Sequence, residues 1–125
     1  MLLDTNIVIY ACQPGGEWLA PWTENPAAAI ASVSRVEALG FPGLSEVENM
    51  AIRRFIAASL CHPLNDDVIE RAIGLRQIRR MGTADAIIAA TALVCGLPLV
   101  TRNMDDFKHI AGLEIINPLA DREGA

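Results

Sequence analysis

The sequence lacks any long hydrophobic run: no window of about 18 apolar residues, the length that a membrane-spanning helix needs, is free of charges. No signal peptide precedes the first apolar segment. The composition also excludes a disordered chain, because 52% of the residues are hydrophobic and only 20% are charged. These absences predict a soluble protein of the cytoplasm, and a length of 125 residues suits one domain over residues 1–125.

Cysteine and histidine are scarce, which argues against disulfide and zinc frameworks. The three cysteines, Cys12, Cys61 and Cys95, are widely spaced among apolar neighbours and form no C-x-x-C pair. They are expected to be buried, reduced thiols. His62 and His109 are isolated in the sequence, so no cluster of His and Cys is available to bind zinc.

Positive charge is also in deficit. Ten basic residues against fifteen acidic ones give a net charge of -5, which is the wrong sign for holding nucleic acid by bulk charge alone. Any action on nucleic acid would need metal ions, a local basic patch or a basic partner. The absence of G-x-G-x-x-G and G-x-x-x-x-G-K-[ST] argues against a nucleotide cofactor or a P-loop.

What the sequence does contain is an alternation of strand-like and helix-like segments. Strands are expected at residues 1–3, 27–32, 61–64, 97–101 and 113–116. Helices are expected at residues 7–13, 35–39, 45–60, 65–78, 84–95 and 105–110. The expected N-caps are Ser45, the pair Asn65 and Asp66, and Thr83. This alternation predicts an α/β fold: a three-layer α/β/α sandwich around a short, mainly parallel sheet.

Three acidic residues follow strands or open a buried helix. Asp4 ends the apolar run Met1 to Leu3, where it could cap the next helix or line a ligand-binding crevice. Asp85 lies in the first turn of an apolar helix, where it could serve the helix dipole or a function. Glu37 follows the second strand, where a solvated side chain and a functional one are both open.

A fourth acidic group comes from the segment LVTRNMDDF. Its strand ends at Thr101, and Asn103, Asp105 and Asp106 follow directly. One of these two aspartates is expected to be an exposed helix cap. The carboxyl ends of parallel strands meet at one edge of a sheet, and four carboxylates there would repel one another unless cations lay among them. Such oxygen ligands suit Mg2+ or Mn2+.

In this order, the segments LLDTN, SRVEALG, ADAIIAATAL and LVTRNMDDF resemble a PIN domain, specifically the VapC type of bacterial toxin ribonuclease. The resemblance covers nearly the whole chain. It implies a Rossmann-like α/β/α sandwich and a Mg2+- or Mn2+-dependent endoribonuclease that leaves a 5'-phosphate and a 3'-hydroxyl. Two alternatives stay open: a non-catalytic module of the same fold that binds RNA or a protein partner, and a different metal phosphohydrolase of Rossmann-like architecture.

The resemblance also assigns roles to individual residues. The implied catalytic residues are Asp4, Glu37, Asp85 and Asp106. Of these, Asp4, Asp85 and Asp106 would bind the metal, and Glu37 would orient the attacking water. The implied pocket-lining residues are Asn6, Thr101, Asn103 and Asp105.

The expected partners are an RNA substrate, an antitoxin protein and a second copy of the chain. Arg76, Arg79 and Arg80 form the only dense basic cluster, which could contact RNA or complement a helix dipole. By resemblance, the antitoxin would insert a basic side chain among the carboxylates. The helix over residues 45–60 could supply the homodimer interface. Residues 81–84 depart from the family, where a proline and a basic residue are frequent.

Overall fold

Five short strands form one sheet in the order β3-β2-β1-β4-β5, and every neighbouring pair is parallel. The strands are β1 (Leu2–Leu3), β2 (Ala29–Ala31), β3 (Leu60–His62), β4 (Leu99–Val100) and β5 (Ile115–Ile116). The computed structural model describes residues 1–120, so the last five residues of the expected domain lie outside the described residues. The expected α/β class and parallel sheet are confirmed.

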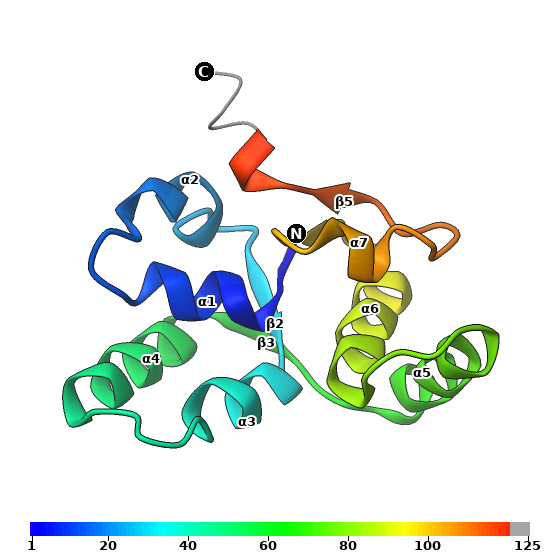
Figure 1. Cartoon of the computed structure of the whole chain (residues 1–125), viewed down its shortest axis with the longest axis horizontal. Helices are drawn as coiled ribbons and strands as arrows, with labels where there is room; N and C mark the ends of the chain where they lie inside the picture. The colour runs from blue at the N-terminus through cyan, green and yellow to red at the C-terminus, as the bar shows by residue number, and fades with distance from the viewer. Residues whose placement is uncertain (121–125) are drawn as a thin grey trace.

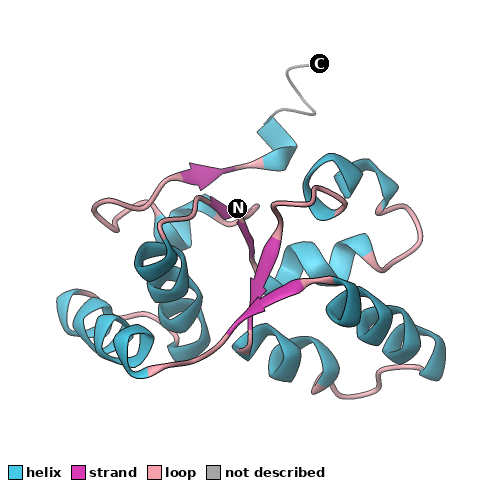
Figure 2. Cartoon of the chain, turned by 180° about the vertical axis from the view of Figure 1, so that it is seen from behind, coloured by secondary structure: helices cyan, strands magenta, loops and turns pink. Residues whose placement is uncertain are grey.

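Helices cover both faces of this sheet (Figures 1 and 2). They are α1 (Thr5–Ala11), the 3-10 helix η1 (Glu17–Leu19), α2 (Ala20–Thr23), α3 (Val33–Leu39), α4 (Glu46–Ala58), α5 (Asp66–Ile78), α6 (Thr83–Cys95) and α7 (Met104–Phe107). Consecutive strand residues point to opposite faces. Leu2 therefore packs with residues of α5, α6 and α7, whereas Leu3 packs with residues of α1, η1 and α4.

The cores on the two faces differ in side-chain size. On one face, α6 buries Ala86, Ala89 and Ala90 completely, and these small side chains let its backbone lie close to the sheet. On the other face, larger side chains such as Ile7 and Leu19 fill the space. The helix over residues 84–95 is apolar almost all round because α6 lies between the sheet and α5 (Figure 1).

Local capping explains where several helices begin. Ser45 accepts a hydrogen bond from the N–H of Glu48 in a full capping box, and Asn65 caps α5, as expected. The expected Thr83 cap is wrong. Thr83 is already helical, and Gly82 occupies the N-cap position without a side-chain hydrogen bond.

The strand order reverses at β1, the central strand of the sheet. From β1 the chain moves outward to β2 and β3, and it later returns to β4 on the other side of β1. In such sheets the crevice at the carboxyl ends of the strands, where the order reverses, is the usual ligand site. Asp4 directly follows β1 at this point.

Two expectations from composition can also be compared with the structure. Among residues 1–120, no helix has both the length and the apolar character needed to cross a membrane. Cys12, Cys61 and Cys95 are free thiols, as expected, but they are half-buried rather than buried.

Candidate active site

Asp4 is fixed where β1 passes into α1. Its side chain is only 4% exposed, and Oδ1 accepts a 2.9 Å hydrogen bond from the N–H of Ile7. The pKa of the Asp4 carboxyl lies above its usual value, mainly because the group is buried. The nearby charge of Glu37 also raises this pKa, whereas hydrogen bonds from Thr101, Ile7 and Asn6 lower it in part. Asp4 therefore caps α1 and also belongs to an acidic cluster, so its two alternative roles coexist.

Glu37 lies on α3 and is exposed to solvent, but one of its carboxylate oxygens is hydrogen-bonded to Thr5. The Thr5 hydroxyl donates a 2.5 Å hydrogen bond to its Oε1. The same hydroxyl lies 2.9 Å from the Ser34 hydroxyl, and both Thr5 and Ser34 are buried. A buried pair of hydroxyls thus sets the direction of an exposed carboxylate. This pair was not expected from the sequence, although each member is a small polar residue just after a strand or early in a helix.

Asp85 joins the cluster from the first turn of α6. Burial raises the pKa of the Asp85 carboxyl, and the negative charges of Asp106, Glu37 and Asp4 raise it further. Its three anionic neighbours come from three other segments of the chain. The structure therefore brings together the four acidic residues that the resemblance implied as catalytic.

The structure also distinguishes between Asp105 and Asp106 in α7. Asp105 is 90% exposed and forms a 2.9 Å salt bridge with Lys108. The hydrogen bond and positive charge of Lys108 lower the pKa of Asp105. Asp106, by contrast, interacts with Asp85. Because successive helical residues point in different directions, only Asp106 faces the acidic cluster.

The chemistry of this cluster fits a hard divalent cation. Its donors are all carboxylate oxygens, and a cation would relieve the repulsion that raises the pKa of Asp85. Within residues 1–120, however, no group of three or more His, Cys, Asp or Glu side chains is arranged to hold a metal ion as it stands. Like charges repel, so binding would have to draw the more exposed carboxylates, Glu37 and Asp106, inward.

The other expected pocket residues lie around this cluster. Thr101 is fully buried and hydrogen-bonded to Asp4, and its hydroxyl also accepts a 3.0 Å bond from the N–H of Asn103. Asn103 and Asp106 border a cavity of about 370 Å3 on one side. Asn6 borders a separate cavity of about 300 Å3 on the other side. Asp105 is paired with Lys108 and borders the same cavity as Asn103 and Asp106.

A cation–π pair near the acidic edge was not expected from the sequence. The Arg102 guanidinium lies 4.8 Å from the centroid of the Tyr10 ring. Arg102 also borders the cavity that contains Asp106. This pair joins the segment after β4 to α1 and places one positive charge beside the acidic residues.

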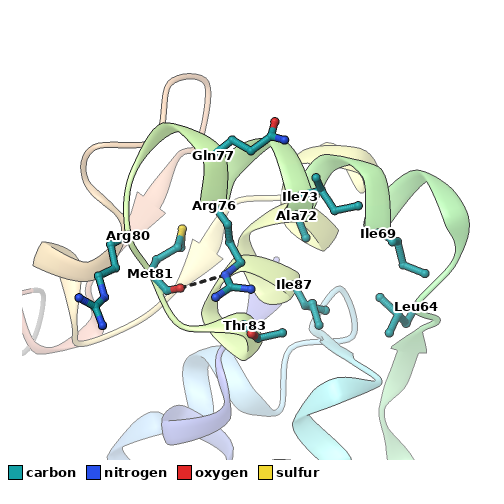
Figure 3. Close-up of a pocket in the computed structure, with 10 residues that line it drawn as sticks. All are labelled: Leu64, Ile69, Ala72, Ile73, Arg76, Gln77, Arg80, Met81, Thr83 and Ile87. Carbon is teal, nitrogen blue, oxygen red and sulfur yellow. Dashed lines mark hydrogen bonds between the residues drawn. The ribbon is translucent and has the colours of Figure 1, made fainter.

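The expected basic cluster lies at the end of α5 and just beyond it. Arg76 donates a 3.2 Å hydrogen bond from Nε to the carbonyl of Met81. Arg76 and Arg80 border an apolar groove between α5 and α6 (Figure 3). This groove reaches Thr83, two residues before Asp85. The arginines therefore border an apolar surface as well as the approach to the acidic cluster.

The chain is similar in sequence to known proteins. The profile of the PIN domain matches residues 1–113. Ribonuclease VapC10 of Mycobacterium tuberculosis is 29% identical over 115 residues, which cover 86% of this chain and 85% of that protein. Ribonuclease VapC1 of Rickettsia felis is 53% identical over 36 residues, but this match spans only 29% of this chain and 27% of that protein.

A solved structure supports the same relationship. It is described as a toxin-antitoxin complex from Klebsiella pneumoniae, and one of its chains is 30% identical to this one. The match covers 94% of this chain and 96% of that chain, with a TM-score of 0.75.

Proposed function

This chain belongs to the PIN-domain family, and we propose that it is a metal-dependent endoribonuclease, the toxin of a bacterial toxin–antitoxin pair. The observation that carries the proposal is the meeting of Asp4, Glu37, Asp85 and Asp106 at the carboxyl edge of the sheet. Its support from known proteins is the similarity to the ribonuclease of Mycobacterium tuberculosis and to the Klebsiella pneumoniae complex.

The four carboxylates divide into metal ligands and a base. Asp4, Asp85 and Asp106 would hold the cation. Mg2+ or Mn2+, when bound, would polarise the scissile phosphate and lower the pKa of the attacking water. Hydrogen bonds from Ile7 and Thr101 keep Asp4 from turning away. Asp4, the most buried of the three proposed ligands, is therefore held in place before substrate binds. Asp85 and Asp106 remain free to adjust.

Glu37 is suited to orienting the attacking water and accepting its proton. It is exposed toward solvent, so water can reach it, while Thr5 fixes one of its oxygens. Within residues 1–120, no second side chain donates a hydrogen bond to the other oxygen of Glu37. This leaves a free acceptor beside Asp85, where hydrolysis would take place.

The test is cleavage of total RNA by partner-free protein in Mg2+ or Mn2+, compared with EDTA. Asp4→Asn and Asp85→Asn are expected to abolish cleavage, and Asp105→Asn, whose carboxylate pairs with Lys108, is expected to retain it. Discrete fragments that vanish in EDTA and in the first two variants would support the proposal. Intact RNA with metal-loaded, partner-free protein would contradict it and leave a binding module.

The groove beside Asn6 suits an antitoxin segment. It is lined by Ile9, Tyr10 and Phe41 together with Glu48 at its rim, and Phe41 is 63% exposed. A basic amphipathic helix could place its apolar face here and direct an Arg or Lys toward the neighbouring carboxylates. The net charge of -5 favours such a basic partner.

Phe41→Ser tests this groove. Because Phe41 is exposed, the variant is expected to fold and to cleave RNA like the parent protein, while its affinity for the antitoxin falls at least about 10-fold, as expected for loss of an aromatic anchor. Val47→Ser, on the exposed side of α4, is the matched control and is expected to bind normally. Equal antitoxin binding by both variants would place the antitoxin elsewhere.

A further inference from the structure

Arg102 carries a positive charge that the protein itself does not use. Its guanidinium carbon lies 4.8 Å from the centroid of the Tyr10 ring, and within residues 1–120 this ring is its only partner. The side chain is half-buried, yet its guanidinium nitrogens still reach solvent. A guanidinium has five N–H donors. The ring therefore holds the arginine in place while all of its donors stay open to a ligand.

The carboxylates near Arg102 do not neutralise it. Arg102 borders the cavity of about 370 Å3 that Asp105 and Asp106 also border. Asp105 is paired with Lys108, and within residues 1–120 Arg102 forms a salt bridge with neither aspartate. Tyr10 keeps the guanidinium over α1 instead. The charge thus remains available to an anion that comes from outside the chain.

The cavity beside Arg102 is polar and suits part of a nucleotide. Its lining includes Asn103 and Asn117, and in the described part of the chain neither side-chain amide donates a hydrogen bond. Its volume of about 370 Å3 lies in the range of roughly 300–1,000 Å3 that is usual for ligand pockets. Guanidinium and amide N–H groups are common donors to the phosphates and sugars of nucleic acids.

We propose that Arg102, held by Tyr10, binds an RNA phosphate next to the one that is cut. This inference rests on the proposed ribonuclease function and adds a substrate contact to it. The scissile phosphate has to lie at the metal-binding carboxylates, and among the described residues Arg102 is paired with none of them. The phosphate within its reach is therefore a neighbouring one, in the cavity that Asp106 borders.

The acidic edge explains why RNA needs such a contact. A bound cation neutralises part of the charge of the four carboxylates, but the phosphates on either side of the cut still approach acidic side chains. Arginine suits a phosphate there because its planar fork donates two parallel hydrogen bonds. An arginine already held by a ring also loses less freedom when the phosphate binds.

The charge of Arg102 favours RNA over the antitoxin as its ligand. The antitoxin segment proposed above is basic, so Arg102 would repel it, whereas a phosphate is attracted. If substitution of Arg102 weakened antitoxin binding and left RNA binding unchanged, the proposal would be wrong.

The test measures binding of a short, fluorescein-labelled, single-stranded RNA of mixed sequence by fluorescence anisotropy. All proteins are partner-free, are kept in Mg2+ and carry Asp85→Asn, which is expected to leave the RNA intact. Arg102→Gln should weaken binding at least about 10-fold at low salt, as for loss of one hydrogen-bonded contact to a charged group. The slope of log K against log salt should fall by about 0.7, the value for one phosphate contact on a single strand.

Three further variants separate charge from geometry. Arg54→Gln is the matched control: it removes the same charge from an exposed position on α4 and should leave affinity and slope nearly unchanged. Arg102→Lys keeps the charge but not the fork, so it should retain the slope and lose part of the affinity. Tyr10→Leu releases Arg102 and should also weaken binding. Tyr10→Phe keeps the ring and should recover the affinity that Tyr10→Leu loses.

The result for Arg102→Gln decides the proposal, after circular dichroism has confirmed that each variant is folded. If it matches Arg54→Gln in both affinity and salt slope, the proposal is overturned, and the arginine only ties α1 to the segment after β4. In proteins with Asp85 intact, Arg102→Gln should raise KM for RNA cleavage at least about 10-fold, with little change in kcat, because the contact exists before the cut.

The two proposals fail in different ways. If the parent protein cuts no RNA but Arg102→Gln still loses affinity and salt slope, the ribonuclease proposal fails, and Arg102 is a phosphate-binding residue of a protein that binds RNA without cutting it. If the parent protein cuts RNA and Arg102→Gln leaves both KM and binding unaltered, only the phosphate contact is refuted.

Discussion

At the scale of single residues, Asp85 carries its charge beside three other carboxylates, and this has a consequence for stability. Its raised pKa means that the folded protein holds this proton to a higher pH than the unfolded chain does. Asp85 therefore makes its full contribution to the free energy of unfolding below the usual pKa of 3.8. This contribution is lost as the pH rises through the pKa that Asp85 has in the folded protein. At neutral pH the charged side chain destabilises the fold.

Asp85→Asn should therefore raise the melting temperature at neutral pH, in EDTA, and the gain should disappear in acid. Thermal unfolding followed by circular dichroism across this pH range measures the difference. Asp105→Asn is the matched control: Lys108 lowers the pKa of Asp105, so this variant should show no gain at neutral pH. An equal gain in both variants would mean that net charge, rather than the cluster, causes the effect.

Thr5 allows a test of how Glu37 is positioned. Thr5→Val keeps the shape of the side chain but removes the hydroxyl that donates to Glu37. If Glu37 acts as proposed, kcat for RNA cleavage should fall roughly 10- to 100-fold, the usual effect of removing such a supporting hydrogen bond, with little change in KM. Thr5→Ser should recover most of the activity. An unchanged kcat in Thr5→Val would contradict a positioning role.

How far the sequence could predict this site depends on the residue. Asp4 and Asp85 could be singled out because an acidic side chain next to apolar strand or helix residues is conspicuous. Asp105 and Asp106 could not be separated, because their directions depend on how α7 is rotated against the sheet. The Thr5–Ser34 pair and the Arg102–Tyr10 pair join distant segments, so their contacts exist only in the folded chain.

At the scale of elements, substitution by alanine should have opposite effects on stability at Gly96 and Gly74. Gly96 ends α6 with a φ of +65°, where a side chain is strained although an added Cβ would meet no atom within 4 Å. Gly96→Ala should therefore cost about 1–2 kcal/mol. Gly74, inside α5, likewise has no atom within 4 Å of the place that a Cβ would occupy, so Gly74→Ala should stabilise the fold by about 0.5–1 kcal/mol.

Urea unfolding of both variants measures these changes. If both variants lose stability by a similar amount, packing disfavours a methyl group at both positions. Two gains would show that the left-handed conformation at Gly96 is not retained in solution.

Element boundaries illustrate what propensity can and cannot predict. Ser45 and Asn65 were identified correctly because their side chains cap helices through local hydrogen bonds. The strands proved shorter than expected, since β4 pairs with its neighbours only over Leu99–Val100. The short helices η1 and α2 were missed: Pro21 and the nearby tryptophans gave no helical period, and packing against α1 stabilises this segment.

At the scale of the whole molecule, metal binding should be visible as stability. A cation that binds the folded protein but not the unfolded chain stabilises it by about 2.7 kcal/mol at one hundred times its Kd. We expect Mg2+ or Mn2+ to raise the melting temperature of the parent protein, and of Asp105→Asn. Asp85→Asn should respond much less. Equal responses in all three proteins would place the cation outside the acidic cluster.

The central position of β1 has a consequence for the order in which the protein is made. Among the five strands of the described residues β1 is made first, yet one of its two neighbours, β4, is made fourth. The N–H of Asp4 bonds to the carbonyl of Val100, and its carboxylate bonds to Thr101. A nascent chain that has not yet released these residues and Asp106 lacks a complete acidic cluster. Because a chain is made from its N-terminus, the acidic cluster can be completed only after the segment that follows β4 has been synthesised.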